Sequence, residues 1–186
     1  MSVRQAFELT GQKAMVTGAG GGIGRELCLG LAEMGADVAL VDINRIGMEK
    51  VAEEVRRFGR DVVICEADVS KVGDVERTVT SILSRWGRVD ILVNCAGIPH
   101  WAPAEDMKEE DWDRVVDINL KGTFLCSQAV GRSMIARRRG KIINIASQVG
   151  LVAYHSRVAY CTAKAGVIKL TRTLALEWAP HGITVN

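Results

Sequence analysis

The stretch KAMVTGAGGGIGREL, residues 13–27, carries the strongest signal for the fold of this chain. Its first five residues form a short apolar run that predicts a buried strand, and the helical pattern that follows begins inside the glycine cluster. Glycine allows a tight turn and a close approach of the backbone, and the N-terminus of the following helix favours a negatively charged group. The stretch therefore predicts a strand, a phosphate-binding turn and a helix in succession.

The glycines in this stretch match one spacing pattern and miss another. Thr17, Gly18, Gly22 and Gly24 fit the pattern Thr-Gly-x-x-x-Gly-x-Gly. The fingerprint Gly-x-Gly-x-x-Gly is not met, because Ile23 stands where its third glycine would be required. Taken alone, the cluster fits a ligand-free, glycine-rich turn between a strand and a helix equally well.

Outside this unit, short β-branched runs alternate with longer stretches of helical period. Further strands are predicted at 37–42, 61–66, 89–94 and 140–146, and two long helices at 109–135 and 158–181. This alternation indicates βαβ units with right-handed crossovers. We expect an α/β fold with a Rossmann-like, doubly wound parallel sheet, helices on both of its faces, and a single domain over residues 1–186.

Local signals mark where the shorter helices begin and end. Gly35, Gly59 and Gly87 lie where a helix must turn back toward the next strand. Ser70 is expected to cap a helix that begins at Lys71.

Asp42 ends the second predicted strand, about twenty residues beyond the glycine cluster. A carboxylate at that place can accept hydrogen bonds from the ribose hydroxyls of an adenosine and would repel a 2'-phosphate. Its neighbour Ile43 offers no compensating cation. The spacing therefore favours NAD over NADP, although Asp42 by itself could be an ordinary turn residue before Asn44.

Tyr160 and Lys164 are four residues apart on a predicted helix, which places them on one face. A phenol has an ordinary pKa of about 10, so a tyrosine that acts as a base near neutrality needs a positive charge beside it. The pair could also be an unremarkable surface pair. Ser147, however, follows the strand at 140–146, and Asn94 ends the strand at 89–94.

These segments together resemble the short-chain dehydrogenase/reductase family. That family combines the TGxxxGxG loop, an Asn-x-Ala-Gly segment, a serine and Tyr-x-x-x-Lys in this order, and here Asn94, Ala96 and Gly97 supply the second motif. The resemblance covers nearly the whole chain, and four ordered motifs are far more specific than any one of them.

The resemblance implies a dinucleotide-binding and catalytic domain, with a role for each matching residue. Tyr160 would be the general acid/base, Lys164 its electrostatic partner and a ligand of the nicotinamide ribose, and Ser147 a partner of the reacting oxygen. Asn119 would hold a water that connects Lys164 to solvent; otherwise it is a core amide bonded to its own backbone. The expected cofactor is NAD, held also by Thr17, Gly18, Gly22, Ile23, Gly24, Asp42, Asp68, Val69, Asn94, Ala96 and Gly97.

The resemblance leaves the substrate open. Ser147 with Gln148, His100 and His155 could bind several hydroxyls, which favours a sugar, a polyol or another small secondary alcohol, or the ketone. The two histidines could equally be exposed loop residues. A 3-oxoacyl thioester is the alternative substrate; an NAD preference weighs against it, since family members with that activity mostly use NADP.

Composition excludes several other classes. With 24 basic and 22 acidic residues the chain has little net charge, and the one tight basic run, Arg137-Arg138-Arg139, reads as a solvated helix end, so we expect no nucleic-acid partner. No stretch is long enough to cross a membrane, and the first ten residues hold no signal core. The five cysteines form no CxxC pair, so we expect no metal site and a cytoplasmic location.

The C-terminus and the two long helices complete the expectations. Family members continue beyond the point where this chain ends, so we expect a domain incomplete at its C-terminus that lacks the last strand or strands. The resemblance also implies a homodimer or homotetramer through helices 109–135 and 158–181, whose surplus apolar positions are Phe124, Leu125, Val130, Met134, Ile168, Leu170, Leu174 and Trp178. An inactive relative that binds a nucleotide or a partner chain remains the alternative to an enzyme.

Overall fold

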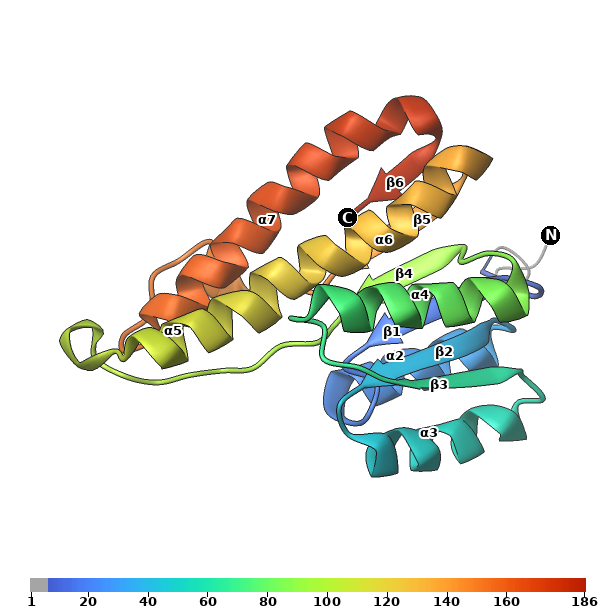
Figure 1. Ribbon diagram of the computed structural model, residues 1–186, viewed down its shortest axis with the longest axis horizontal. Helices are drawn as coiled ribbons and strands as arrows, with labels where there is room; N and C mark the ends of the chain where they lie inside the picture. The colour runs from blue at the N-terminus through green and yellow to red at the C-terminus, as the bar shows by residue number, and fades with distance from the viewer. Residues whose placement is uncertain (1–6) are drawn as a thin grey trace.

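The computed structural model describes residues 7–186 and contains one sheet of six parallel strands in the order β3-β2-β1-β4-β5-β6 (Figure 1). The strands are β1 Lys13–Thr17, β2 Asp37–Asp42, β3 Val62–Glu66, β4 Ile91–Asn94, β5 Gly140–Asn144 and β6 Ile183–Val185. The order runs outward in both directions from the β1–β4 pair, which is the arrangement of a doubly wound sheet. The predicted fold class is confirmed, and β6 pairs with β5 in parallel at the sheet edge.

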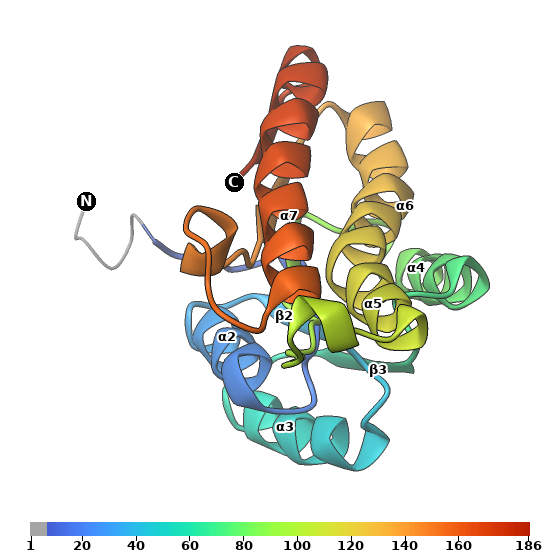
Figure 2. The same cartoon turned by 90° about the vertical axis from the view of Figure 1, so that its left-hand side faces the viewer.

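Helices cover the sheet on two sides (Figure 2). They are α2 Gly22–Glu33, α3 Arg45–Arg57, α4 Val72–Trp86, α5 Glu109–Val116, α6 Gly122–Arg137 and α7 Val158–Trp178, with short 3-10 turns at Ala104–Asp106, Gln148–Gly150 and Ala179–His181. α2 and α3 share one apolar core with the sheet, and α4, α6 and α7 share another on the opposite face. Burial of these two faces is the main stabilising contribution to the fold.

The glycine turns follow the sequence prediction, whereas the predicted serine cap is wrong. Gly35, Gly59 and Gly87 have φ values of 102°, 71° and 72°, a left-handed conformation that favours glycine. Ser70 does not cap α4: its hydroxyl donates to Asp68 Oδ1 at 2.7 Å instead, and the helix begins only at Val72. The Asp68 carboxylate accepts from both the backbone N–H and the hydroxyl of Ser70, which holds Ser70 in the turn before the helix and leaves Lys71 at the N-cap position.

The long helix predicted at 109–135 is interrupted. α5 and α6 are joined by a π-helical turn, Asp117–Lys121, in which the Gly122 N–H donates to the Asp117 carbonyl. The side-chain Nδ2 of Asn119 donates at 2.9 Å to the carbonyl of Val115, the group that its own backbone N–H would use in an α-helix. This competition gives a physical reason for the wider turn.

Several apolar positions that the sequence suggested for a second surface are buried inside the chain. Val130, Met134 and Leu174 are at most 5% exposed and belong to the core on the α4–α6–α7 face. Trp178 packs so closely on Gly131 that a Cβ there would lie 2.7 Å from its ring. The long helices therefore use these apolar residues against the sheet and one another.

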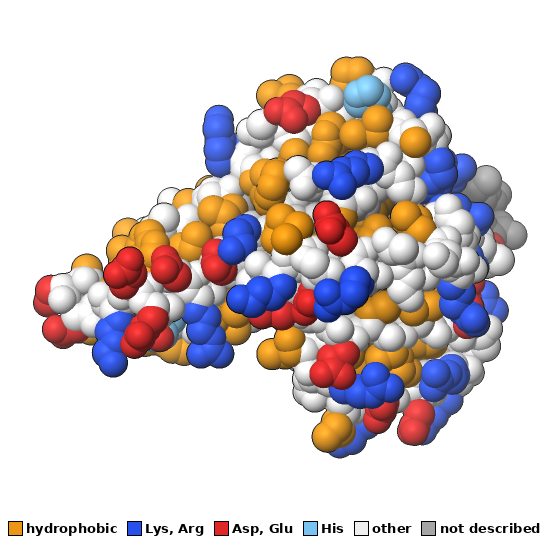
Figure 3. All heavy atoms as spheres, viewed as in Figure 1, with side chains coloured by type: hydrophobic (Ala, Val, Ile, Leu, Met, Phe, Trp, Pro, Cys, Tyr) orange, Lys and Arg blue, Asp and Glu red, His pale blue; other side chains and the backbone are white. Residues whose placement is uncertain are grey.

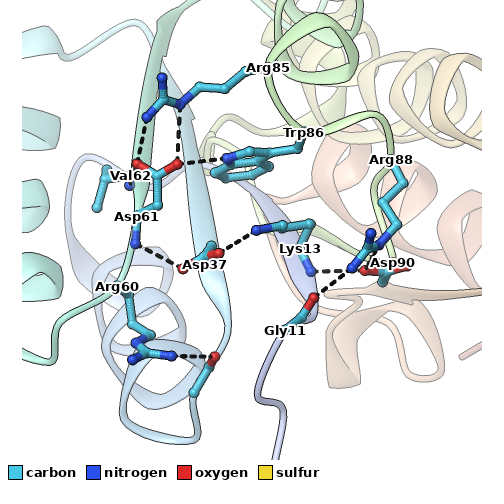
Figure 4. Close-up of polar contacts among 11 residues, drawn as sticks. Gly11, Lys13, Asp37, Arg60, Asp61, Val62, Arg85, Trp86, Arg88 and Asp90 are labelled. Carbon is cyan, nitrogen blue, oxygen red and sulfur yellow. Dashed lines mark hydrogen bonds and ion pairs between the residues drawn. The ribbon is translucent and has the colours of Figure 1, made fainter.

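Charged side chains fasten the strands at the sheet end where they begin (Figure 4). Lys13 Nζ lies 2.5 Å from Asp37 on the neighbouring strand, and the Lys13 backbone N–H donates to Asp90 at 3.0 Å. Asp61 accepts from the Arg85 guanidinium and from the Trp86 indole, each at 2.9 Å. These bonds link β1, β2 and the segments before β3 and β4 at the edge opposite the strands' carboxyl ends.

One part of the sheet is covered on a single face. Side chains of β5 alternate between buried and exposed, and Ile143 is 39% exposed on the face that α2 and α3 cover elsewhere.

Among residues 7–186, no helix combines the length and the apolar character that a bilayer crossing requires. The sequence analysis expects no signal-peptide core in the first ten residues. Six of these, residues 1–6, lie outside the described part of the chain.

Candidate active site

A cavity of about 620 Å³ lies at the carboxyl ends of the strands, above the β1–β4 switch point. Open α/β sheets bind ligands at this place. The fold brings segments together there that are far apart in the sequence. Those predicted site residues that line the cavity are Gly18, Gly22, Ile23, Gly24, Asp42, Asp68, Val69, Ala96, Gly97, Asn119, Ser147, Tyr160 and Lys164.

The glycine loop owes its composition to close backbone contacts. Gly18 has φ 71°, and a Cβ on it would lie 2.9 Å from the backbone of Ala96. A Cβ on Gly24 would lie 1.9 Å from the carbonyl oxygen of Gly18. Since no side chain fits at either position, the loop stays folded against β4 and the start of α2. The helix N-terminus and its free N–H groups are thereby presented to the cavity.

Asp42 is oriented by two backbone amides. Its Oδ2 accepts from the Gly20 N–H and its Oδ1 from the Asn44 N–H, both at 2.8 Å. Each carboxylate oxygen retains a lone pair for a further donor. The carboxylate therefore joins the glycine loop to the end of β2 by hydrogen bonds. It can still accept a hydrogen bond from the hydroxyl of a ligand in the cavity.

Thr17 and Asn94 lie behind the cavity wall. Thr17 Oγ1 accepts from the N–H groups of Cys95 and Ala96, each at 3.1 Å. Asn94 Nδ2 donates to Ser127 Oγ at 2.9 Å and to Asn144 Oδ1 at 2.8 Å. Both side chains are buried and hold the loop after β4 in place.

The partners Ser127 and Asn144 did not stand out in the sequence. Asn144 stands between two isoleucines at the end of β5, and Ser127 lies between Cys126 and Gln128 on α6. That local irregularity was the only signal, and nothing in it named Asn94 as the partner.

Lys164 and Tyr160 project from the first turns of α7. Lys164 Nζ donates to the Ile145 carbonyl at 2.7 Å and lies 5.8 Å from the centroid of the Tyr160 ring. Lys164 is only 5% exposed, and burial lowers the pKa of its ammonium. Ser147, at the end of the segment after β5, also faces the cavity. The cavity thus holds a phenol, a buried ammonium and a hydroxyl.

Asn119 is completely buried in the π-helical turn, with one polar atom left over. Its Nδ2 donates to the carbonyls of Ile98 and Val115, each at 2.9 Å. Its Oδ1 has no hydrogen-bond partner among residues 7–186. A Cβ on Gly97 would lie 2.5 Å from this oxygen and 3.6 Å from Lys164 Nζ, so both atoms border the space that Gly97 leaves open. A buried amide oxygen in such a position is a place where an ordered water is expected.

Three of the predicted substrate-binding residues do not line the cavity. His100 Nε2 lies 3.4 Å from Asp111 Oδ2, and His155, which is exposed, shares a 2.7 Å hydrogen bond with Ser156. Gln148 is exposed. Of the predicted set only Ser147 borders the cavity, whose lining also includes Ile98 and Pro99.

Several apolar residues that line the cavity belong to none of the sequence motifs. Ile43 and Ala67 lie beside Asp42 and Asp68, and Ile118 precedes Asn119. Cys95 also lines the cavity, and burial raises the pKa of its thiol. Within residues 7–186 no group of His, Cys, Asp or Glu side chains is arranged to hold a metal ion.

Comparisons with known proteins agree with this geometry. Residues 12–186 match the family model described as short chain dehydrogenase. The chain is 41% identical to the NAD-dependent glycerol dehydrogenase of Listeria innocua, over 97% of this chain and 70% of that protein. It is 44% identical to a 3-oxoacyl-(acyl-carrier-protein) reductase of Staphylococcus epidermidis, over 94% of this chain and 72% of that one. The crystal structure of an NAD+-bound xylitol dehydrogenase superposes with a TM-score of 0.93 at 40% identity, over 95% and 68% of the two chains.

Proposed function

Since the chain belongs to the short-chain dehydrogenase family, we propose that it transfers a hydride between NAD(H) and a small secondary alcohol or ketone of the polyol class. The observation that carries this proposal is that a single cavity combines the glycine loop and Asp42 with Tyr160 and Lys164. Relatives that are named as acting on glycerol and on xylitol support the substrate class.

The residues of the cavity fit a nicotinamide dinucleotide. The glycine loop leaves no room for side chains where a pyrophosphate would approach the N-terminus of α2. Asp42 would accept the adenosine ribose hydroxyls, and Asp68 and Val69 would border the adenine. Gly97, Tyr160 and Lys164 would hold the nicotinamide end.

The charges around Asp42 support NAD rather than NADP. Arg25, the cation nearest the glycine loop in the sequence, is paired with Glu54 of α3. Arg45 hydrogen-bonds Glu49 at 3.0 Å. With these two cations engaged, a 2'-phosphate would meet the Asp42 carboxylate.

When bound, the nicotinamide accepts or gives the hydride. The chain's own residues manage the proton. Tyr160 would take the proton from the substrate hydroxyl, or return it in the reverse direction, while Ser147 orients the reacting oxygen by a hydrogen bond. Lys164, held by the Ile145 carbonyl, supplies positive charge beside the phenol. A water between Lys164 Nζ and Asn119 Oδ1 would carry the proton toward solvent.

A panel assay tests the proposal. Formation of NADH is followed at its absorbance band with glycerol, tetritols, pentitols and hexitols, and its consumption with the corresponding ketones. We expect turnover of at least one polyol with NAD+ and none by the Tyr160→Phe protein. Absence of turnover with every alcohol and ketone, together with intact NADH binding, would favour the inactive nucleotide-binding relative.

The acyl thioester reaction remains the second candidate, because the 3-oxoacyl reductase relative is 44% identical. A 3-oxoacyl thioester with NADPH and with NADH belongs in the same panel. Faster reduction of that substrate than of any small ketone would assign the chain to the reductase group.

A further inference from the structure

Three side chains, Trp101, Tyr154 and Arg157, form a cluster on segments that adjoin cavity residues in the sequence: Trp101 follows Pro99, and Tyr154 and Arg157 precede Tyr160. The guanidinium carbon of Arg157 is 4.8 Å from the centroid of the Trp101 ring and 4.9 Å from that of the Tyr154 ring. A cation at these distances is attracted by the electron-rich faces of both rings. We call Trp101, Tyr154 and Arg157 the aromatic clamp.

The clamp joins two loops that are far apart in the sequence. Trp101 belongs to the loop between β4 and α5, and Tyr154 to the segment between β5 and α7. The backbone is joined at the same place, where Ala102 pairs with Arg157 in an isolated bridge and the Ala102 N–H donates to the Ser156 carbonyl at 3.0 Å. Figure 1 shows the segment before α7 meeting the loop that leads to α5.

Both loops carry residues of the site. Arg157 is the N-cap of α7, three residues before Tyr160. Pro99, which lines the cavity, stands two residues before Trp101. Movement of either loop would therefore change the wall that faces a substrate next to Tyr160.

The Arg157 side chain has no further polar partner in the described part of the chain. It forms no ion pair with a carboxylate among residues 7–186, and its Nε is buried without a hydrogen-bond acceptor. Its neighbour Ser156 has φ 55°, a left-handed conformation that a serine keeps only where surrounding contacts impose it. Ser156 is held by the bridge between Ala102 and Arg157, by the Ala102 N–H that its carbonyl accepts, and by its hydrogen bond with His155.

We propose that Arg157 is a positioning residue for the dehydrogenase reaction: through Trp101 and Tyr154 it holds both loops in the arrangement that receives the substrate. This proposal rests on the proposed function. If the loops are already ordered before the substrate binds, binding does not have to include the entropy cost of ordering them. The clamp therefore contributes to substrate affinity. Most of the residues assigned to the cofactor, among them the glycine loop, Asp42 and Asp68, lie on segments that the clamp does not touch, so cofactor affinity should depend on it far less.

Steady-state kinetics with the best polyol of the panel test the proposal. For Arg157→Gln we expect KM to rise roughly tenfold, the scale of two cation–π contacts, with kcat and the Kd of NADH little changed. Arg157→Lys keeps the charge but not the planar group and should recover part of the loss. Arg56→Gln, an exposed arginine at the end of α3, is the matched control and should leave KM unchanged.

A double-mutant cycle separates a clamp from independent effects. Because Arg157 and Trp101 act through one contact, Arg157→Gln combined with Trp101→Leu should raise KM little beyond the larger single effect. Additive effects, or an equal loss of NADH affinity, would overturn the proposal. A loss confined to substrates that carry a carboxylate or phosphate would also overturn it, because Arg157 would then bind the substrate directly.

A measurement on the protein alone distinguishes failure of the clamp from failure of the proposed function. The Trp101 contribution to fluorescence is the difference between the unmutated chain and Trp101→Phe. We expect acrylamide to quench this contribution more strongly in the Arg157→Gln background, since the ring loses its partner. Unchanged quenching with active enzyme would contradict the clamp, whereas an enzyme inactive on all alcohols with increased quenching would contradict only the proposed function.

Discussion

Asp42 is the residue on which the choice of cofactor depends. We expect Asp42→Ala to weaken NAD(H) binding roughly tenfold or more, because hydrogen bonds to a charged group are lost. The same change should reduce the preference for NAD(H) over NADP(H), because it removes the repulsion between the carboxylate and the 2'-phosphate. Titration of both cofactors onto both proteins measures this. Asp42→Asn is the control, since it removes the charge but keeps an acceptor for the Gly20 N–H. Tighter NADP(H) binding by the unmutated chain would contradict the assignment.

Tyr160 and Lys164 are expected to fail in different ways when mutated. Tyr160→Phe loses only the proton-transfer group, so turnover should fall by at least about 100-fold while NADH binding survives. Lys164→Ala should impair both, since Lys164 is assigned to the cofactor ribose as well as to the phenol, and it is hydrogen-bonded to Ile145. Substantial turnover by Tyr160→Phe would require another acid or base in the cavity.

At the scale of single elements, the π-helical turn is the feature that shapes the site most. Asn119 lies inside a helical run, yet its side-chain Nδ2 donates a hydrogen bond to the backbone carbonyl of Val115. Its Oδ1 then faces the space beside Gly97. A regular helix through 117–121 would place the following residues differently against α7. The irregular turn therefore places Asn119 Oδ1 near Lys164 Nζ.

The Asp61 carboxylate, at the sheet end opposite the cavity, should make the free energy of unfolding depend on pH in the acid range. The Arg85 guanidinium, with the Trp86 indole, holds the pKa of Asp61 below its ordinary value. A lowered carboxyl pKa means that the stabilisation is present above the unfolded pKa, about 4, and is lost as the pH falls through the lower folded value. Asp61→Asn should therefore lower the free energy of unfolding by roughly 0.5–1 kcal/mol at pH 7, since the pair is partly exposed to solvent.

Urea unfolding at a series of pH values measures this difference. The gap between Asp61→Asn and the unmutated chain should close as the pH falls below about 4, where the carboxyl is protonated in both the folded and the unfolded chain. A gap of the same size at pH 7 and at pH 2 would mean that the ionised carboxylate contributes nothing.

At the scale of the whole molecule, the outer surfaces of α6 and α7 are the candidate contact between copies of the chain. Figure 3 shows hydrophobic side chains on the surface over these helices, among interspersed charges. Leu176 on α7 is 79% exposed and Phe124 on α6 is 39% exposed. Leu174, by contrast, is buried in the core, so a charge there would unfold the chain rather than separate copies.

We propose that the chain associates through these two helices and expect Leu176→Arg to shift it toward the monomer, because a charge would be buried in the contact. Light scattering over a range of concentrations measures the mass. Ile46→Arg, at a position 70% exposed on α3, is the matched control and should leave the mass unchanged. An unmutated chain that is monomeric at every concentration would contradict the proposal.

Short-range patterns in the sequence predicted the succession of strands and helices along the chain and most of the residues that line the cavity. The strands at 13–17 and 37–42 agree with the structure residue for residue, and the motif residues from Gly18 to Lys164 that line the cavity could be named in advance. These features depend on short-range rules: apolar periodicity, glycine turns and the fixed handedness of βαβ crossovers.

Features that depend on residues distant in the chain could be recognised only in the folded molecule. Thr17 and Asn94 stand behind the cavity because their partners come from other elements, and Val130 and Leu174 are buried because β-strands and helices enclose them. The same holds for the π-helical turn, which Asn119 stabilises through the carbonyl of Ile98 as well as its own helix. The physical reason is that a hydrogen bond or a packing contact is set by distance in space, which periodicity along the chain does not encode.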